Sequence, residues 1–92
     1  MINTVELTPL VRKQLKKLPA HIVLNFQNWV EDVEIRGIEK VRKIPGYHDE
    51  PLRGELRGYR SVRLSRAYRA YYRIDGSTVE FVQVERIDKH EY

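Results

Sequence analysis

Residues 59–85 read YRSVRLSRAYRAYYRIDGSTVEFVQVE, and this stretch decides the fold. Polar residues alternate there with branched and aromatic ones, and a period of two is typical of half-buried strands. The alternation covers residues 59–64, 68–74 and 78–85, and the turn-forming sequence Asp-Gly-Ser at 75–77 separates the last two segments. We therefore expect three consecutive antiparallel strands.

The second of these strands carries two kinds of side chain, because neighbours along a strand point to opposite faces of a sheet. One face is expected to join the core and holds Tyr68, Ala70, Tyr72 and Ile74. The other face is expected to be basic and holds Arg69, Tyr71 and Arg73. The core face and the basic face of the sheet are thus predicted to be separate.

Helical spacing replaces this alternation in the first half of the chain. After a short strand at residues 3–7, Thr8 is a good N-cap and Pro9 suits the first helical position. The inward side chains of this helix are expected to be Leu10, Gln14, Leu15 and Leu18. A second helix is expected at about 19–35, with a core stripe of Ile22, Val23, Phe26, Trp29, Val30 and Val33. Gly37 suits its C-terminal cap, and one or two further helical turns should follow.

The expected fold class is α+β. It consists of an N-terminal strand, two to three helices and a three-stranded antiparallel meander, with the helices packed on one face of a small antiparallel sheet. The chain has 92 residues, of which 41% are hydrophobic, which suits one compact core and a single domain over residues 1–92.

Composition also excludes several classes of protein. Cysteine is absent, so disulfides and thiolate metal sites are excluded, and a reducing cytoplasm is the expected setting. No apolar run approaches about 18 residues, so neither a membrane span nor a signal peptide is expected. The three histidines are scattered and no glycine-rich phosphate loop is present, so we expect no metal or other cofactor.

Positive charge is concentrated between residues 52 and 73. Seven arginines stand there against one acid, Glu55, whereas the rest of the chain holds 10 basic and 12 acidic residues. Guanidinium groups bind phosphate oxygens in a bidentate fork, and the four interspersed tyrosines offer rings for stacking. Nucleic acid is the first partner that this pattern indicates, and a solvated arginine-rich surface is the alternative.

A set of side chains suited to phosphodiester cleavage surrounds this segment. Cleavage of RNA needs a base for the 2′-hydroxyl, an acid for the leaving oxygen, and cations for the charge that gathers on phosphorus. Candidates for these roles are His48, Glu50, Arg63, Arg69, Arg86, His90 and Tyr92. They form one site only if the loop before the sheet and the C-terminal tail meet the same face.

Several short runs resemble the bacterial RelE/ParE toxin superfamily. They are YHDEPLRG at 47–54, LRGYR at 56–60, YRAYY at 68–72 and the tail ERIDKHEY at 85–92. The likeness is greatest to the YafQ and YoeB branches and to RelE itself. It implies a RelE-like fold and a ribosome-dependent endoribonuclease, an mRNA interferase that cuts mRNA in the ribosomal A site and is held inactive by a cognate antitoxin.

The resemblance also implies a role for individual residues. Glu50 would be the base, His90 the general acid and Tyr92 the ring that stacks on a base, while Arg63 and Arg69 would stabilise the phosphate. Further phosphate contacts would come from Arg53, Arg57, Arg60 and Arg86, and contacts to 16S ribosomal RNA from Lys13, Lys16 and Lys17. YafQ-like toxins have histidine where this chain has Glu50, and Ala67 replaces their second-strand aspartate, so the base is either Glu50 or a histidine.

Two other functions share this fold. A ParE-like inhibitor would bind DNA gyrase without cleaving anything, and a plain RNA-binding module would bind RNA through the arginines alone. The combination of Glu50, His90 and Tyr92 favours the nuclease, because an inhibitor needs no acid, base and stacking ring. An acidic, initially disordered antitoxin segment that covers the basic sheet is the expected protein partner.

Overall fold

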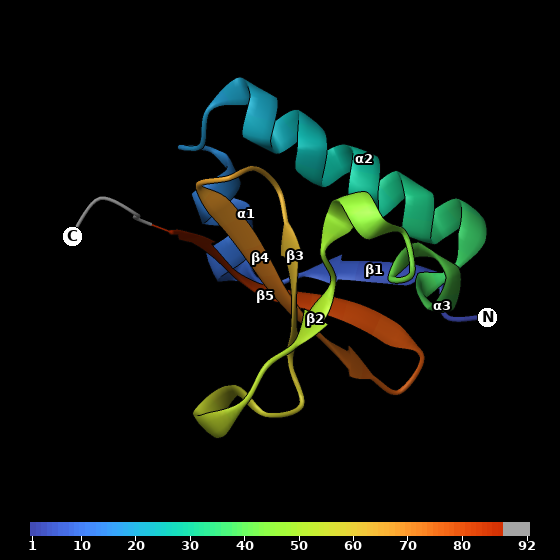
Figure 1. Cartoon of the computed structure of the whole chain (residues 1–92). Coiled ribbons are helices and arrows are strands. Elements are labelled where there is room, and N and C mark those ends of the chain that lie inside the picture. Colours follow the sequence, from blue (N-terminus) through green and yellow to red (C-terminus); the bar gives the residue numbers. More distant parts are fainter. Residues whose placement is uncertain (88–92) are drawn as a thin grey trace.

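The computed structural model describes residues 1–87 and has the expected α+β architecture, with helices packed against one five-stranded sheet (Figure 1). The elements are β1 (Thr4–Leu7), α1 (Pro9–Leu15), α2 (Ala20–Arg36), α3 (Ile38–Val41), η1 (Pro45–Tyr47), β2 (Glu50–Pro51), η2 (Gly54–Leu56), β3 (Arg60–Arg63), β4 (Tyr68–Asp75) and β5 (Thr78–Arg86), where η marks a 3₁₀ turn.

The strand order β1-β5-β4-β3-β2 contains the predicted meander and two features that alternation did not predict. Strands β3, β4 and β5 are antiparallel, as expected, but β1 pairs with β5 in parallel, so the sheet is mixed and not antiparallel throughout. Alternation reports which face a side chain occupies and carries no information on strand direction. The second feature is β2, which lies where a loop was expected and pairs Glu50 with Ser61.

The N-terminus of α1 is formed as predicted, but its buried side differs by one residue. The Thr8 hydroxyl oxygen accepts a hydrogen bond from the Val11 amide at 3.3 Å, and Pro9 occupies the first turn. Val11 is fully buried, whereas Leu10 is 49% exposed, which corrects the expected inward position. The reason is the docking of α1 along β5: the Gln14 side-chain amide bonds both the amide and the carbonyl of Val84, beyond the point where β1 ends.

The core lies between α2 and the sheet. Trp29, Phe26, Tyr72 and Phe81 are almost completely buried. Phe26 and Trp29 each meet Phe81 edge to face, with ring centroids 4.8 Å and 5.1 Å apart, and Tyr72 meets Trp29 and Phe81 in tilted contacts. Aromatic rings prefer such tilted arrangements, because the positive edge of one ring meets the negative face of the other. This packing covers the face of β4 that holds Ala70 and Tyr72, so Arg69 and Tyr71 lie on the opposite face of the sheet.

Gly37 joins α2 to α3 and closes the helical layer. Its φ of +86° is a left-handed conformation that favours glycine, and its amide bonds the Val33 carbonyl at 2.8 Å. An added Cβ would lie 2.6 Å from Cγ of the exposed Met1 side chain, which can move aside, so the positive φ is the constraint at this position. Among the helices of residues 1–87, none is long and apolar enough to cross a bilayer.

Candidate functional site

Strand register gathers polar side chains from four strands on the sheet face opposite the helices. One row across the sheet is Glu50, Ser61, Tyr71 and Gln83, and the next is Arg63, Arg69 and Glu85. Residues two apart on a strand are about 7 Å apart, so the two rows are neighbours. We call these seven residues the polar face. It brings three predicted site residues, Glu50, Arg63 and Arg69, onto one surface.

Arg69 is held by its neighbour across the sheet. Its Nη1 donates a hydrogen bond to the Ser61 hydroxyl at 2.9 Å, and Ser61 is only 1% exposed. An ion pair of Arg69 with Glu80 or Glu85 would be the structural alternative to phosphate binding. Glu80 instead pairs with Arg73 at 2.8 Å, and no ion pair within residues 1–87 includes Arg69. The charge of Arg69 is therefore held by Ser61, with no carboxylate of residues 1–87 bound to it.

Arg63 interacts with a histidine from the preceding loop. Its Nη1 lies 3.2 Å from Nε2 of His48, and because a guanidinium can only donate, this contact requires an unprotonated Nε2. His48 has φ +47° and ψ +49°, the one left-handed backbone among the non-glycine residues from 1 to 87. Such conformations are costly and collect at functional sites.

Glu50 is exposed on β2, and its carboxylate makes no hydrogen bond or ion pair with any residue from 1 to 87. Arg86 ends β5, where its register partner is Tyr68. His90 and Tyr92 lie outside the described residues.

Arg60 lies on the other side of the sheet and has a structural role. Its Nε bonds the Asp49 carboxylate at 2.6 Å, and that fully buried carboxylate also accepts a hydrogen bond from the Tyr72 hydroxyl at 2.6 Å. Burial lowers the pKa of Arg60, but the bond and charge of Asp49 outweigh it, so the pKa is raised. Burial, followed by Asp49, also raises the pKa of the Tyr72 phenol.

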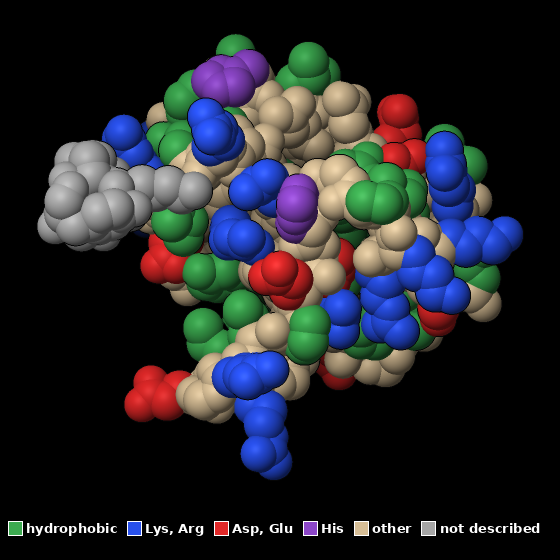
Figure 2. Space-filling view, in the orientation of Figure 1, with side chains coloured by type: hydrophobic (Ala, Val, Ile, Leu, Met, Phe, Trp, Pro, Cys, Tyr) green, Lys and Arg blue, Asp and Glu red, His purple; other side chains and the backbone are tan. Residues whose placement is uncertain are grey.

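The remaining predicted contacts lie away from the polar face. Arg53 and Arg57 flank η2 in the exposed connection between β2 and β3, which extends away from the body of the molecule in Figure 1. Lys13, Lys16 and Lys17 are exposed on α1 and directly after it. Basic side chains accordingly lie in several separate parts of the surface in Figure 2 and do not form one patch.

Comparison with known proteins identifies the family. The family model described as the ParE toxin of the type II toxin-antitoxin system, parDE, matches residues 5–90. The chain belongs to this family. No curated protein sequence matches it.

Solved structures of related toxins share the fold of this ParE-family chain. The toxin–antitoxin complex RelBE2 from Mycobacterium tuberculosis contains a chain with 31% identity and a TM-score of 0.64, and the match covers 94% of this chain and 99% of that one. YafQ from E. coli has 14% identity and a TM-score of 0.70, with 91% and 92% covered. The archaeal RelE-RelB complex from Pyrococcus horikoshii gives 21% identity and a TM-score of 0.68, with 94% and 96% covered. The resemblance to RelE/ParE toxins is confirmed, and the protein is a toxin of a type II toxin–antitoxin system.

Sequence reasoning missed two contacts that organise the polar face of this toxin. Ser61 anchors Arg69, and Glu85 accepts a hydrogen bond from the Tyr71 hydroxyl. Burial and this bond raise the pKa of Tyr71 to about 12. The alternation of strand residues could have placed Ser61 and Arg63 on one face and Arg60 on the other, because only the first two are an even number of residues apart.

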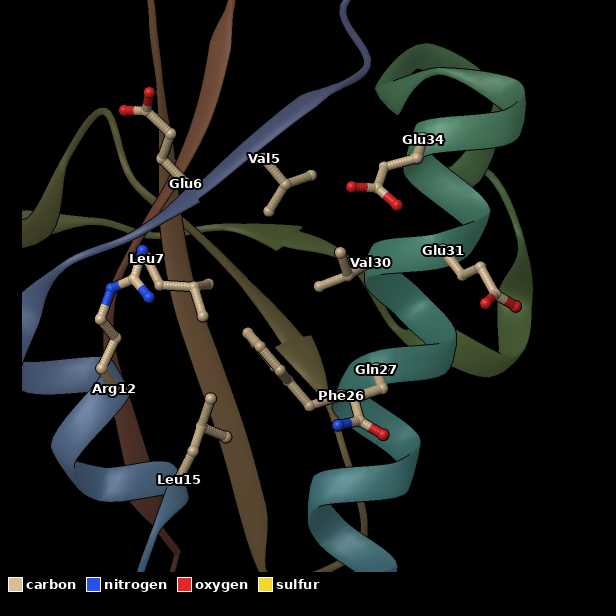
Figure 3. A pocket seen from close by; sticks show the side chains of 10 residues that line it. All are labelled: Val5, Glu6, Leu7, Arg12, Leu15, Phe26, Gln27, Val30, Glu31 and Glu34. Atoms are coloured by element: carbon tan, nitrogen blue, oxygen red, sulfur yellow. The ribbon is translucent and has the colours of Figure 1, made fainter.

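Two further observations limit what the toxin surface can bind. In the described part of the chain, no three His, Asp or Glu side chains are grouped so that they could hold a metal ion. A groove of about 390 Å³ lies between α1, α2 and β1 (Figure 3), with apolar walls from Val5, Leu7, Leu15, Phe26 and Val30. Glu6, Glu31 and Glu34 also line it, with Arg12 as the only cation among its lining residues, so this groove disfavours a polyanion.

Proposed function

We propose that this toxin is a ribosome-dependent endoribonuclease that cleaves mRNA and thereby stops translation. The supporting observation is that Glu50, Arg63 and Arg69 lie together on the polar face. Within residues 1–87, the Glu50 carboxylate makes no ion pair, and neither arginine is paired with a carboxylate. A base and two cations on one surface match the needs of phosphodiester cleavage.

In this mechanism the Glu50 carboxylate removes the proton of a 2′-hydroxyl. The freed 2′-oxygen attacks the adjacent phosphorus, and the bond from phosphorus to the 5′-oxygen of the next nucleotide breaks. A 2′,3′-cyclic phosphate and a new 5′-hydroxyl end result. His48 is the alternative base, because its Nε2 is already an acceptor toward Arg63.

Arg63 and Arg69 stabilise the negative charge that gathers on the phosphate oxygens during the attack. Each guanidinium offers N–H groups beyond the one that holds it in place, to His48 and to Ser61 respectively. Fixed donors stabilise a transition state well, because they need no reorganisation when the charge develops.

The acid and the stacking ring are assigned by family resemblance. His90 protonates the leaving 5′-oxygen, for which an imidazole with a pKa near 6.5 is suited. Tyr92 stacks on a base of the mRNA. Exposed basic residues, among them Arg53, Arg57 and Lys13, contact ribosomal RNA around the A site. The toxin acts in the cytoplasm and is neutralised there by a cognate antitoxin.

Mapping of mRNA 5′ ends in a translating extract tests this proposal. Glu50→Gln, Arg69→Ala and His90→Gln should each reduce cleavage at least about a hundredfold, the usual effect of losing an acid, a base or a charge-stabilising donor. Arg73→Ala is the matched control, because Arg73 shares β4 and the face of Arg69 but is paired with Glu80 and Asp75. Undiminished cleavage by both Arg69→Ala and His90→Gln would refute the assignment.

The match to the ParE family favours inhibition of DNA gyrase as a second candidate. A gyrase inhibitor binds through its surface and needs no proton transfer. A supercoiling assay with purified gyrase separates the two functions: inhibition that survives Glu50→Gln and His90→Gln, without new mRNA ends, would establish the second candidate in place of the first.

A further inference from the structure

A small polar pocket opens beside the polar face. It has a volume of about 220 Å³ and lies between α2, η1 and the end of β3, where its lining residues are Asn25, Asn28, Gly46, Tyr47, Arg63 and Leu64. Arg63 therefore belongs both to the polar face and to this pocket. Whatever binds in the pocket will lie next to a group bound by Arg63 and Arg69.

The polar side chains of the pocket make few hydrogen bonds within residues 1–87, and Asn25 and Asn28 are exposed. Asn25 donates its Nδ2 to the Leu64 carbonyl at 2.7 Å, which leaves its Oδ1 as an acceptor. The Asn28 amide makes no hydrogen bond with any residue from 1 to 87. Arg63 uses Nη1 toward His48 and keeps further N–H donors. The pocket thus offers guanidinium donors together with carboxamide acceptors.

The walls of the pocket are held firmly. The Tyr47 hydroxyl donates to the Asp32 carboxylate at 2.5 Å, and its ring meets Trp29 edge on with centroids 6.3 Å apart. Gly46 leaves the pocket open: a Cβ added to it would meet no heavy atom within 4 Å, and its φ lies outside the left-handed region. Because Gly46 lines the pocket and has open space around it, a larger residue can be introduced at position 46 without straining the backbone.

We propose that this pocket binds a purine base of the mRNA, guanine in preference to adenine, beside the phosphate held by Arg63 and Arg69. This inference rests on the proposed ribonuclease function. Single-stranded RNA is recognised by hydrogen bonds to base edges and by stacking on flat side chains.

Guanine fits both kinds of polar group in the pocket. Its O6 and N7 accept from a guanidinium, and its N1–H and amino group donate to carboxamide oxygens such as Oδ1 of Asn25 or Asn28. Adenine can donate N6–H to one carboxamide oxygen and accept at N7, but it lacks the O6 acceptor beside N7 that a guanidinium binds in a bidentate fork, and its N1 carries no proton to donate. Free phosphate is a poor occupant, because the pocket holds one cation and two neutral amides.

NMR titration of the ¹⁵N-labelled protein with guanosine, adenosine, cytidine and uridine tests binding without any phosphate. Guanosine should shift the signals of Gly46, Tyr47 and the Asn28 side-chain amide, at a concentration at least about tenfold below that needed for cytidine or uridine. Gly46→Leu, which adds bulk to the pocket lining, and Asn28→Ala should each weaken guanosine binding by at least about tenfold. Gln27→Ala is the matched control, because Gln27 is the neighbouring amide on α2 and lies in the apolar groove instead (Figure 3).

The sequence at the cleavage site supplies a second measurement. The wild-type toxin should cut mRNA with guanine enriched at one position beside the broken bond, and both Gly46→Leu and Asn28→Ala should abolish that enrichment. The proposal is overturned if guanosine shifts none of the pocket signals. It is also overturned if guanosine binds the Gly46→Leu variant as tightly as the wild type and thermal unfolding shows that both proteins are folded. If the protein cuts no RNA, the ribonuclease function fails, and the nucleoside titration still decides the pocket.

Discussion

Asp49 and Glu50 are adjacent in the sequence and have opposite roles, because successive side chains point to opposite faces of the sheet. The Asp49 carboxylate is fully buried between Arg60 and the Tyr72 hydroxyl, whereas Glu50 is exposed on the polar face. A buried carboxylate needs partners, since an unpaired charge in the interior is strongly destabilising. At this residue scale, Asp49 stabilises the sheet edge that presents Glu50.

The role of Arg60 can be tested by stability. Arg60→Met should lower the free energy of unfolding by about 3 kcal/mol, because it leaves the Asp49 charge buried with only a neutral hydroxyl partner. Adding Asp49→Asn should restore part of that loss. Urea denaturation followed by circular dichroism measures both effects. Arg63→Ala serves as control with a change of no more than about 0.5 kcal/mol, and an equal loss in this control would contradict the structural role of Arg60.

Tyr71 gives a prediction about pH. Burial and the bond to Glu85 raise the pKa of Tyr71 from its ordinary 10.0 to about 12 in the folded protein, so folding favours the protonated phenol. The resulting stability is fully present below pH 10 and is lost as the pH rises from 10 to 12. As the pH rises over this range, the unfolding temperature of the wild type should therefore fall relative to that of Tyr71→Phe.

Subtracting the Tyr71→Phe curve cancels the titration of lysines and of the other tyrosines, including Tyr47, whose pKa burial and Asp32 also raise to about 12. A difference that stays constant from pH 9 to 12 would show that the Tyr71–Glu85 bond contributes nothing.

At the scale of elements, local signals predicted where helices and strands begin but not how distant segments join. The Thr8–Pro9 start of α1 and the Gly37 cap of α2 depend only on nearby backbone, and both are confirmed. The parallel pairing of β1 with β5 depends on contacts more than 70 residues apart in the chain, such as Thr4 with Thr78, and no local pattern encodes it. The short strand β2 is likewise defined by its partner β3.

The candidate site follows the same division. Alternation on β4 predicted that Arg69 and Tyr71 share a face, because that depends on one strand alone. The contacts of Arg69 with Ser61 and of Arg63 with His48 need the register between strands and the turn before β2, which a sequence pattern does not specify. Three of the residues from the sequence prediction meet on the polar face, while Arg60 is held by Asp49 on the other side.

The turn that leads into β2 can be tested at position 48. His48 has a left-handed backbone, which glycine adopts freely and a β-branched residue strongly resists. His48→Val should therefore be less stable than His48→Gly by about 1–2 kcal/mol in urea denaturation. Both variants lose the imidazole, so the difference between their free energies of unfolding reports the cost of the left-handed backbone. Equal stability of the two variants would show that the left-handed turn is not maintained.

At the scale of the whole molecule, the helices cover one face of the sheet and leave the polar face uncovered, and further basic residues lie far from that face. The net charge of +4 is spread over separate regions, and part of it is neutralised internally, as where Glu80 pairs with Arg73. Surface lysines that contact phosphates release counterions on binding, so they make affinity depend on salt. Salt dependence can therefore distinguish lysines that contact ribosomal RNA from lysines that merely face water.

Lys13 on α1 and Lys16 directly after it are exposed three residues apart, and Lys40 and Lys43 have the same spacing around the end of α3. If α1 contacts ribosomal RNA, the double variant Lys13→Ala/Lys16→Ala should reduce the slope of log affinity against log salt by about 2, and weaken ribosome binding most at low salt. Co-sedimentation of the toxin with ribosomes over a range of potassium chloride concentrations measures this slope. Lys40→Ala/Lys43→Ala removes the same charge at another place, so it should leave the slope unchanged. Equal slope changes in the two variants would mean that net charge alone governs binding and that α1 makes no specific contact.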